Sequence, residues 1–136
     1  GLSNIVEDTT PQLGGNLDMN TKALVHKFYV GNNGSSDFTF SAPGHVWFDS
    51  DIGTENDPTL YLRRGEIYQF QISATGHPFW IKTSPGTGTG NAYTTGITNN
   101  GTQNGLIEFR VRMSAPSTLY YNCQYHSAMA GTINIV

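Results

Sequence analysis

Apolar and polar residues alternate in short runs from about residue 23 to the C-terminus. The clearest runs cover residues 23–30, 60–64, 66–72 and 106–113, and shorter ones cover 38–40 and 46–48. A period of two residues is typical of half-buried strands, and the Gly, Pro and Asn residues between the runs predict turns. About eight short strands joined by such turns predict an all-β fold, a two-sheet Greek-key β-sandwich.

Two polar regions differ from this pattern. In residues 1–20 the large apolar side chains after Val6 are limited to Leu13, Leu17 and Met19, which predicts a linker or docking arm outside the core. Residues 83–103 contain five glycines and no periodicity, which predicts an extended surface loop. We therefore expect an N-terminal extended arm over residues 1–20 and one sandwich domain over residues 21–136.

Composition narrows the possible partners and locations. The 136 residues carry a net charge of −3, only 12% are charged, and the single cysteine cannot form an intramolecular disulfide. Such a balance is usual for β-rich extracellular or virion proteins. The sequence has no run of basic residues that would predict a nucleic-acid partner, and no apolar stretch is long enough to span a bilayer. We expect an extracytoplasmic location, periplasmic or extracellular, or a place in a virion.

Candidate metal ligands gather near the C-terminus, between two predicted strands. Cys123, His126 and Met129 follow one another at intervals of three residues. A thiolate, an imidazole and a thioether form a soft, mixed ligand set that suits copper. The set needs a second imidazole, and the segment 75–81 offers His77. These four residues are the predicted copper ligands.

Each of these side chains also has an ordinary alternative role. A free cysteine is usually a small buried hydrophobe, a methionine fills gaps in a core, and a single histidine usually lies at the surface or in a hydrogen bond. Their joint occurrence at this spacing favours a metal site over those separate roles. His26 and His45 lie outside the pattern, and we expect an ordinary structural role for both.

The four residues resemble the copper-binding motif of the cupredoxins, the small blue copper proteins. The spacing C-x-x-H-x-x-M is similar to that of the amicyanin and pseudoazurin branches, and the 46 positions from His77 to Cys123 are typical of the family. Residues 77–81 also resemble the histidine strand of the cytochrome oxidase subunit II domain. The resemblance implies a cupredoxin-like sandwich with a mononuclear type 1 copper site. His77, Cys123 and His126 would be its equatorial ligands and Met129 its weak axial ligand.

The resemblance also implies a function, one-electron transfer. A redox partner protein would dock near His126, on an apolar rim that includes Pro78, Ala128 and Ala130. The sequence shows no catalytic triad order, paired-carboxylate motif or phosphate-binding glycine loop, so an enzyme of those classes is not predicted. We expect an electron carrier that is not an enzyme.

Residue 78 departs from the family pattern. Asn usually follows the first histidine ligand, and its N–H donates to the cysteine sulfur, whereas Pro78 has no N–H. Tyr125 occupies the loop position that can supply a second donor, so we expect one N–H···S hydrogen bond from the loop side. Strand alternation places Phe79 on the His77 side as a wall of the site, and Trp80 is expected in the core.

A second hypothesis comes from the N-terminal arm. Residues 7–18 resemble a segment that recurs in tail-fibre and structural proteins of marine bacteriophages. This resemblance implies a β-sandwich module of a larger viral or extracellular assembly, in which copper is structural, incidental or absent. The abundance of Gly, Thr and Asn and the long loop over residues 83–103 agree with it.

Overall fold

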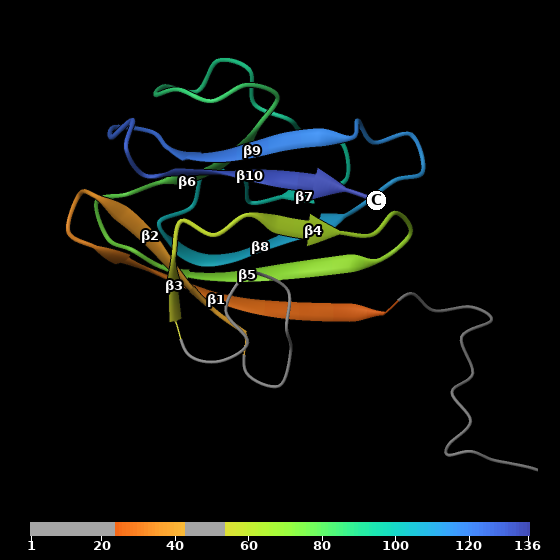
Figure 1. Cartoon of the computed structure of the whole chain (residues 1–136), viewed down its shortest axis with the longest axis horizontal. Coiled ribbons are helices and arrows are strands. Elements are labelled where there is room, and N and C mark those ends of the chain that lie inside the picture. The colour runs from red at the N-terminus through yellow and green to blue at the C-terminus, as the bar shows by residue number, and fades with distance from the viewer. Residues whose placement is uncertain (1–23, 43–53) are drawn as a thin grey trace, which may run out of the picture.

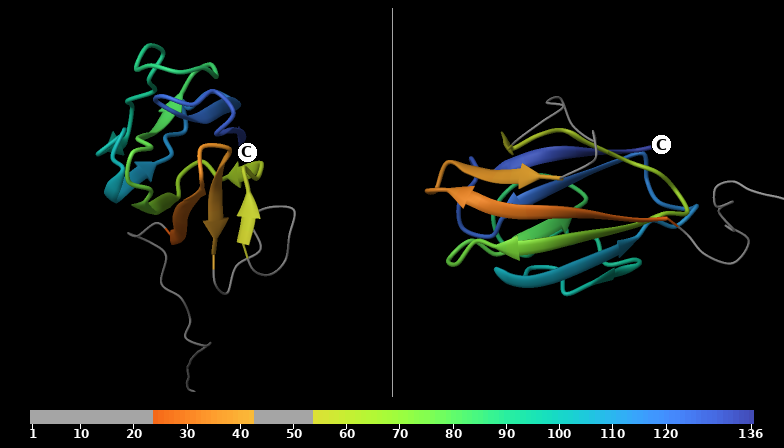
Figure 2. Two further views of the ribbon diagram at one scale, coloured as in Figure 1. Left: turned by 90° about the vertical axis from the view of Figure 1, so that its left-hand side faces the viewer. Right: turned by 90° about the horizontal axis from the view of Figure 1, so that it is seen from below.

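The computed structural model describes residues 24–42 and 54–136, which form two β-sheets packed face to face (Figure 1, Figure 2). The strands are β1 (Val25–Asn33), β2 (Asp37–Ser41), β3 (Thr54–Asn56), β4 (Leu60–Leu62), β5 (Ile67–Ser73), β6 (Phe79–Lys82), β7 (Ile97–Thr98), β8 (Asn104–Arg110), β9 (Thr118–Cys123) and β10 (Ala130–Ile135). No helix occurs within the described ranges. The prediction of an all-β, two-sheet sandwich is confirmed.

The order of the strands requires repeated crossing between the sheets. The first sheet has the order β3-β2-β1-β5-β8-β7 and the second β4-β10-β9-β6. Strand β1 runs parallel to β5 and β4 parallel to β10, while the other pairs are antiparallel. Five links between consecutive strands change sheet, as is typical of Greek-key sandwiches. The link from β4 to β5 turns at Gly65, whose φ of 88° suits glycine, and the sequence predicted this break.

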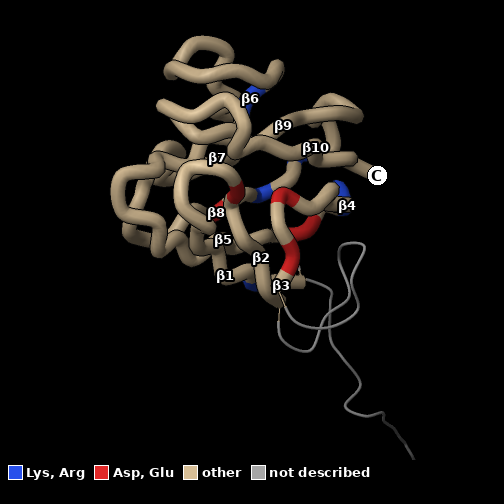
Figure 3. Tube along the Cα trace, turned by 60° about the vertical axis from the view of Figure 1, so that its left-hand side comes forward, with Lys and Arg blue, Asp and Glu red and all other residues tan. Residues whose placement is uncertain are grey.

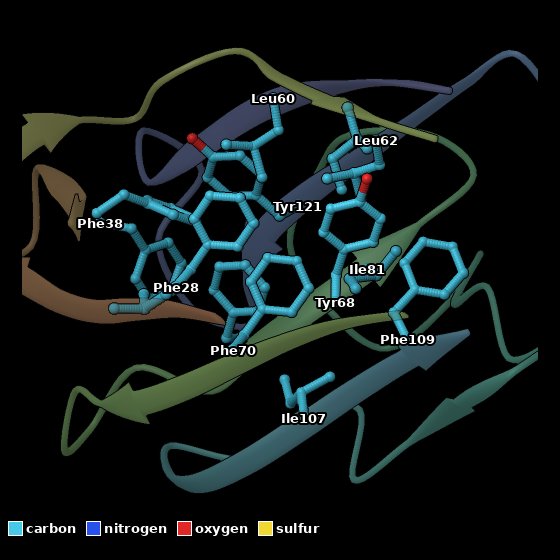
Figure 4. Packing of buried hydrophobic residues seen from close by; sticks show 14 of the residues in the cluster. Phe28, Phe38, Leu60, Leu62, Tyr68, Phe70, Ile81, Ile107, Phe109 and Tyr121 are labelled. Atoms are coloured by element: carbon cyan, nitrogen blue, oxygen red, sulfur yellow. The ribbon is translucent and has the colours of Figure 1, made fainter. Parts of the chain in front are cut away.

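Aromatic side chains fill the space between the sheets (Figure 4). Phe38 and Phe70 from the first sheet and Phe79 and Tyr121 from the second are all fully buried. The ring centroids of Phe38 and Phe79 lie 4.9 Å apart, and those of Phe70 and Phe79 lie 5.9 Å apart. Each such pair contributes about 0.5–1.5 kcal/mol beyond the burial of its area. The sandwich therefore has a continuous apolar core built from side chains of both sheets.

Some predicted features lie elsewhere or are more ordered than expected. The arm over residues 1–20, the run at 46–48 and His45 lie outside the described residues. Strand β3 was not predicted because its three polar residues show no alternation. The segment 83–103 is not an unstructured loop, since it contains β7 and forms hydrogen bonds to β6 and to the end of β9.

Trp80 was predicted in the core, and this prediction was wrong. On β6 the side chains of Phe79 and Ile81 are fully buried in the core, so alternation turns Trp80 to the outer face of the second sheet. The segment 83–103 covers it there, and a Cβ atom at Gly101 would lie 2.3 Å from the indole ring. Glycine is therefore required at position 101, and the indole is packed outside the sandwich.

Candidate metal centre

Two neighbouring strands bring the predicted ligands together. His77 lies just before β6, Cys123 is the last residue of β9, and His126 lies in the loop between β9 and β10. Strands β6 and β9 are antiparallel, and Phe79 pairs with Cys123. The Gln124 N–H donates to the Pro78 carbonyl at 3.0 Å and extends this pairing. Main-chain pairing therefore places ligands that are 46 positions apart side by side.

Three donor atoms form a compact triangle. Cys123 Sγ lies 3.8 Å from His77 Nδ1 and 3.5 Å from His126 Nδ1, and the two Nδ1 atoms lie 3.2 Å apart. A point equidistant from the three atoms is about 2.0 Å from each, close to the zinc–imidazole and zinc–thiolate bond lengths of about 2.0–2.1 and 2.3 Å. The residues therefore fit a single small metal ion.

The surroundings of the triangle favour a neutral imidazole at His77. Cys123 is fully buried, His77 is 9% exposed and His126 is half-buried. Burial, and then the nearby His126, lower the pKa of His77 below its usual value of 6.5. Within the described residues, neither imidazole forms an ion pair with a carboxylate. A neutral imidazole keeps the lone pair with which it binds a metal ion, so the environment prepares His77 for that role.

Main-chain hydrogen bonds shape the loop from residue 123 to residue 129. The Cys123 N–H donates to the Met129 carbonyl at 2.9 Å, and the Met129 N–H donates to the His126 carbonyl at 3.2 Å. The Tyr125 N–H donates to Cys123 Sγ at 3.5 Å, so the hydrogen bond predicted from the loop side is confirmed. Such a bond stabilises negative charge on the sulfur. Pro78, which follows His77, has no N–H to offer the sulfur.

Met129 is fully buried at the end of the loop, and its role as an axial ligand stays a prediction. Pro78 was expected on the rim and is buried, whereas Ala128 is exposed and Tyr125 is 61% exposed. No Lys, Arg, Asp or Glu occurs in residues 74–79 or 123–130, and charged positions are sparse along the described trace (Figure 3). These two segments form the part of the rim that we describe as uncharged, and exposed Tyr125 was not predicted there.

Buried polar residues behind the triangle were not predicted. Lys82 is 2% exposed and Asn122 is 1% exposed, and both lie on the strands that carry the ligands. The sequence feature that could have revealed buried Lys82 is its position directly after the apolar run 79–81 in a predicted strand. His26, by contrast, lies in the first sheet and is hydrogen-bonded to Glu66 at 2.8 Å, which confirms its expected structural role.

The chain is similar to several solved structures of rusticyanin. Rusticyanin from Thiobacillus ferrooxidans is 21% identical, with a TM-score of 0.46 over 85% of this chain and 79% of that one. A methionine-to-glutamine mutant of rusticyanin is 18% identical, with a TM-score of 0.49 over 85% of this chain and 80% of that one. A further structure, described as a copper protein, is 19% identical, with a TM-score of 0.48 over the same shares. No protein-family model and no curated protein matches the sequence.

The fold is cupredoxin-like. Two features of this chain carry that statement: the two-sheet sandwich and the cluster of His77, Cys123 and His126 at the paired ends of β6 and β9. The comparisons give no support to the resemblance of residues 7–18 to phage tail-fibre proteins, or to a virion module. In the part of this cupredoxin-like chain that the structure describes, no helix has the length and apolar character to cross a membrane.

Proposed function

We propose that the chain binds one copper ion at His77, Cys123 and His126 and transfers single electrons as a type 1 copper protein. The triangle of one sulfur and two Nδ1 atoms, with a main-chain N–H donating to the sulfur, carries this proposal. Zinc would accept the same distances. The mixture of thiolate and imidazole favours copper, because sulfur suits the cuprous state and imidazole suits both states.

Each residue has a defined part in the proposed activity. Strands β6 and β9 hold His77 and Cys123, while the Met129 N–H bond to the His126 carbonyl holds the third ligand residue. Ligands fixed in this way move little when the charge at the centre changes by one, which favours fast electron exchange. Copper, when bound, supplies the one-electron change. Met129 is proposed as the weak axial ligand.

The partner surface belongs to the same proposal. His126 is the more exposed of the two imidazoles, and exposed Tyr125 and Ala128 flank it in the loop. We place the docking of a redox partner protein on this uncharged rim, so that the electron passes by way of His126. The chain would act as an electron carrier and not as an enzyme, in an extracytoplasmic compartment.

A copper titration followed by visible absorption and electron paramagnetic resonance tests the proposal. We expect one equivalent of Cu(II) to produce an intense blue band from thiolate-to-copper charge transfer, which disappears on reduction and returns on oxidation. Zn(II), bound by the same atoms, gives a colourless control whose occupancy native mass spectrometry measures. A protein that stays colourless with copper, or that is not reversibly reduced, would contradict electron transfer and leave a structural metal site.

A further inference from the structure

A buried carboxamide lies behind the metal cluster. Asn122 is the neighbour of Cys123 on β9, and its side chain is 1% exposed. Its Nδ2 donates to the Cys123 carbonyl at 2.9 Å and, at a longer 3.4 Å, to the His126 carbonyl. Its Oδ1 accepts the Gly86 N–H at 2.9 Å. One side chain thus joins the main chains of two proposed ligand residues to the segment 86–88.

A buried lysine fixes the segment 86–88 in turn. Lys82 on β6 is 2% exposed, and its Nζ donates to the carbonyls of Gly86 at 2.7 Å, Thr87 at 3.3 Å and Gly88 at 3.1 Å. An ammonium group has three N–H donors, and the three carbonyls satisfy all of them. The Gly88 N–H donates to the Gln124 carbonyl at 2.8 Å. The segment is therefore held between Lys82 and the metal loop.

The buried hydrogen-bonding groups of Asn122 and Lys82 have few alternative partners. A buried polar group that loses its partner is unfavourable, and the low dielectric of the interior makes each remaining bond matter more. Within the described residues, no carboxylate pairs with Lys82, so the segment 86–88 is its main partner. The segment 86–88 and the loop from residue 123 to residue 129 are consequently held in one position relative to each other.

We propose that Asn122 is a positioning residue of the metal centre and that Lys82 supports it through the segment 86–88. This inference rests on the proposed copper function. Because the same Nδ2 holds the carbonyls of Cys123 and His126, it sets the distance between the sulfur of one and the imidazole of the other. The bonds between Cys123, His126 and Met129 join only main-chain atoms, and the Trp80 indole N–H, on the outer face of the sheet, donates to the side chain of Gln124 at 3.0 Å. Asn122, on the same face, donates to the main-chain carbonyls of the proposed ligand residues themselves.

Asn122→Asp is the direct test. Aspartate keeps the shape and one acceptor but has no N–H, so it sets an anionic oxygen against two carbonyls. We expect copper affinity to fall by about tenfold or more, the range for loss of groups that orient metal ligands. The copper hyperfine coupling and the reduction potential should shift with it, because the sulfur and imidazole change their relative placement.

Asn100→Asp is the matched control. Asn100 lies in the same covering segment, and its carboxamide forms three similar bonds, from Nδ2 to the carbonyls of Ile81 at 3.1 Å and Tyr93 at 3.0 Å and from the Ile81 N–H to Oδ1 at 2.8 Å. None of these bonds reaches residues 123–129. We expect this variant to lose thermal stability but to keep the copper affinity, spectrum and potential of the original protein.

A measurement on the metal-free protein separates the inference from the proposed function. Amide hydrogen exchange at Tyr125 and Met129, followed by NMR, should be about tenfold faster in Asn122→Asp and unchanged in Asn100→Asp. If the original protein never turns blue, the proposed function fails while this exchange result still tests the positioning role. Equal changes in the two variants, or unchanged exchange and copper affinity in Asn122→Asp, would overturn the inference.

Lys82→Met tests the support that the segment 86–88 gives to Asn122. It replaces Asn122→Asp as the test if that variant does not fold. It removes three hydrogen bonds to the segment 86–88 and leaves Asn122 in place. We expect the same shifts in hyperfine coupling and amide exchange as for Asn122→Asp, but smaller by several-fold. A Lys82→Met protein with the spectrum and exchange rates of the original protein would show that the segment 86–88 does not support the metal loop.

Discussion

Two buried histidine sites in this sandwich have different partners. In the first sheet, His26 Nε2 lies 2.8 Å from Glu66 Oε1. At the paired ends of β6 and β9, His77 and His126 face each other across 3.2 Å with Cys123 Sγ beside them. Burial does not distinguish the two sites, since His26 is 6% exposed and His77 is 9% exposed.

The difference between the sites lies in the chemistry of the partner. A carboxylate satisfies an imidazole N–H without any further group, so the contact between His26 Nε2 and Glu66 needs no metal ion. Two imidazole nitrogens and a thiol sulfur that converge on one point each carry a lone pair. A shared proton or a metal ion must therefore lie between these three atoms. The identity of the nearest group, and not burial, therefore separates a structural histidine from a proposed ligand.

Cys123→Ser tests the proposed ligand site and should have the largest effect. Removing the sulfur should abolish the visible band and lower copper affinity by more than about 100-fold, beyond the effect expected from an outer partner of a ligand. The fold should remain, because the aromatic core is independent of the metal. Absorption and circular dichroism measure the two effects, and His26→Gln should keep the band. An unfolded Cys123→Ser protein would instead make the centre a folding element.

Glu66→Gln tests the structural site. Its Oε1 accepts from His26 and, at 3.1 Å, from the Tyr68 hydroxyl, and loss of the charge should lower the free energy of unfolding by about 1–2 kcal/mol. Glu108→Gln is the matched control, because its pair with exposed Arg110 is worth only about 0–1 kcal/mol. Urea unfolding of the metal-free proteins measures both changes. Equal losses, or an altered copper spectrum in Glu66→Gln, would contradict the distinction between the sites.

Asp57 extends the comparison to a half-buried carboxyl without a cationic partner among its described contacts. Burial raises the pKa of Asp57 from 3.8 to about 7, so the folded state prefers the neutral acid, and the stability from this group is lost as pH rises from about 4 through 7. The carboxamide introduced by Asp57→Asn would mimic the neutral acid, and asparagine tolerates the φ of 42° at this position.

We expect Asp57→Asn to stabilise the protein by about 1 kcal/mol at pH 8, less than the full shift implies because solvent screens the carboxyl. The same variant should make little difference at pH 4. Thermal unfolding at the two pH values measures this. A gain of the same size at both would show that the ionisation of Asp57 is not its cause.

The smallest expected effects concern hydrogen bonds to the sulfur of Cys123. Tyr125→Pro removes the N–H that donates at 3.5 Å, and Pro78→Asn adds an N–H on the other side. A donor favours the reduced state, in which the sulfur carries more negative charge, so the first variant should lower the potential and the second should raise it. Each shift should be a modest fraction of the about 1.5–3 kcal/mol that such a bond is worth.

Electrochemistry with an unchanged visible spectrum measures these shifts. If Pro78→Asn leaves the potential unchanged or lowers it, residue 78 does not face the sulfur, and the role of His77 as the first histidine ligand would need reconsideration. Tyr125→Pro with an unchanged potential would mean that the bond of 3.5 Å is too weak to matter.

The sequence predicted what depends on local periodicity and on the spacing of ligand types. Alternation located β1, β5 and β8 because each buries one face of a sheet. The short loop placed Cys123 and His126 together, and the need for a second imidazole, together with the family resemblance, added His77. Trp80 was assigned to the wrong side because Phe79 was given to the metal site, whereas Phe79 fills the core and alternation turns Trp80 outward. The contacts of Lys82 and Asn122 were not foreseen, because they form only when the segment 83–103, which has no periodicity, folds onto β6 and β9.

The spacing of the proposed ligands also bears on how copper and folding are linked. Cys123, His126 and Met129 stay within seven consecutive residues even in an extended chain, whereas His77 reaches them only when β6 pairs with β9. An unfolded chain would thus retain most of the ligand set, and a ligand that also binds the unfolded state stabilises the folded one by less than its affinity suggests. Copper should therefore raise the melting temperature less than its dissociation constant implies, and a newly made chain can capture the ion before the sandwich closes.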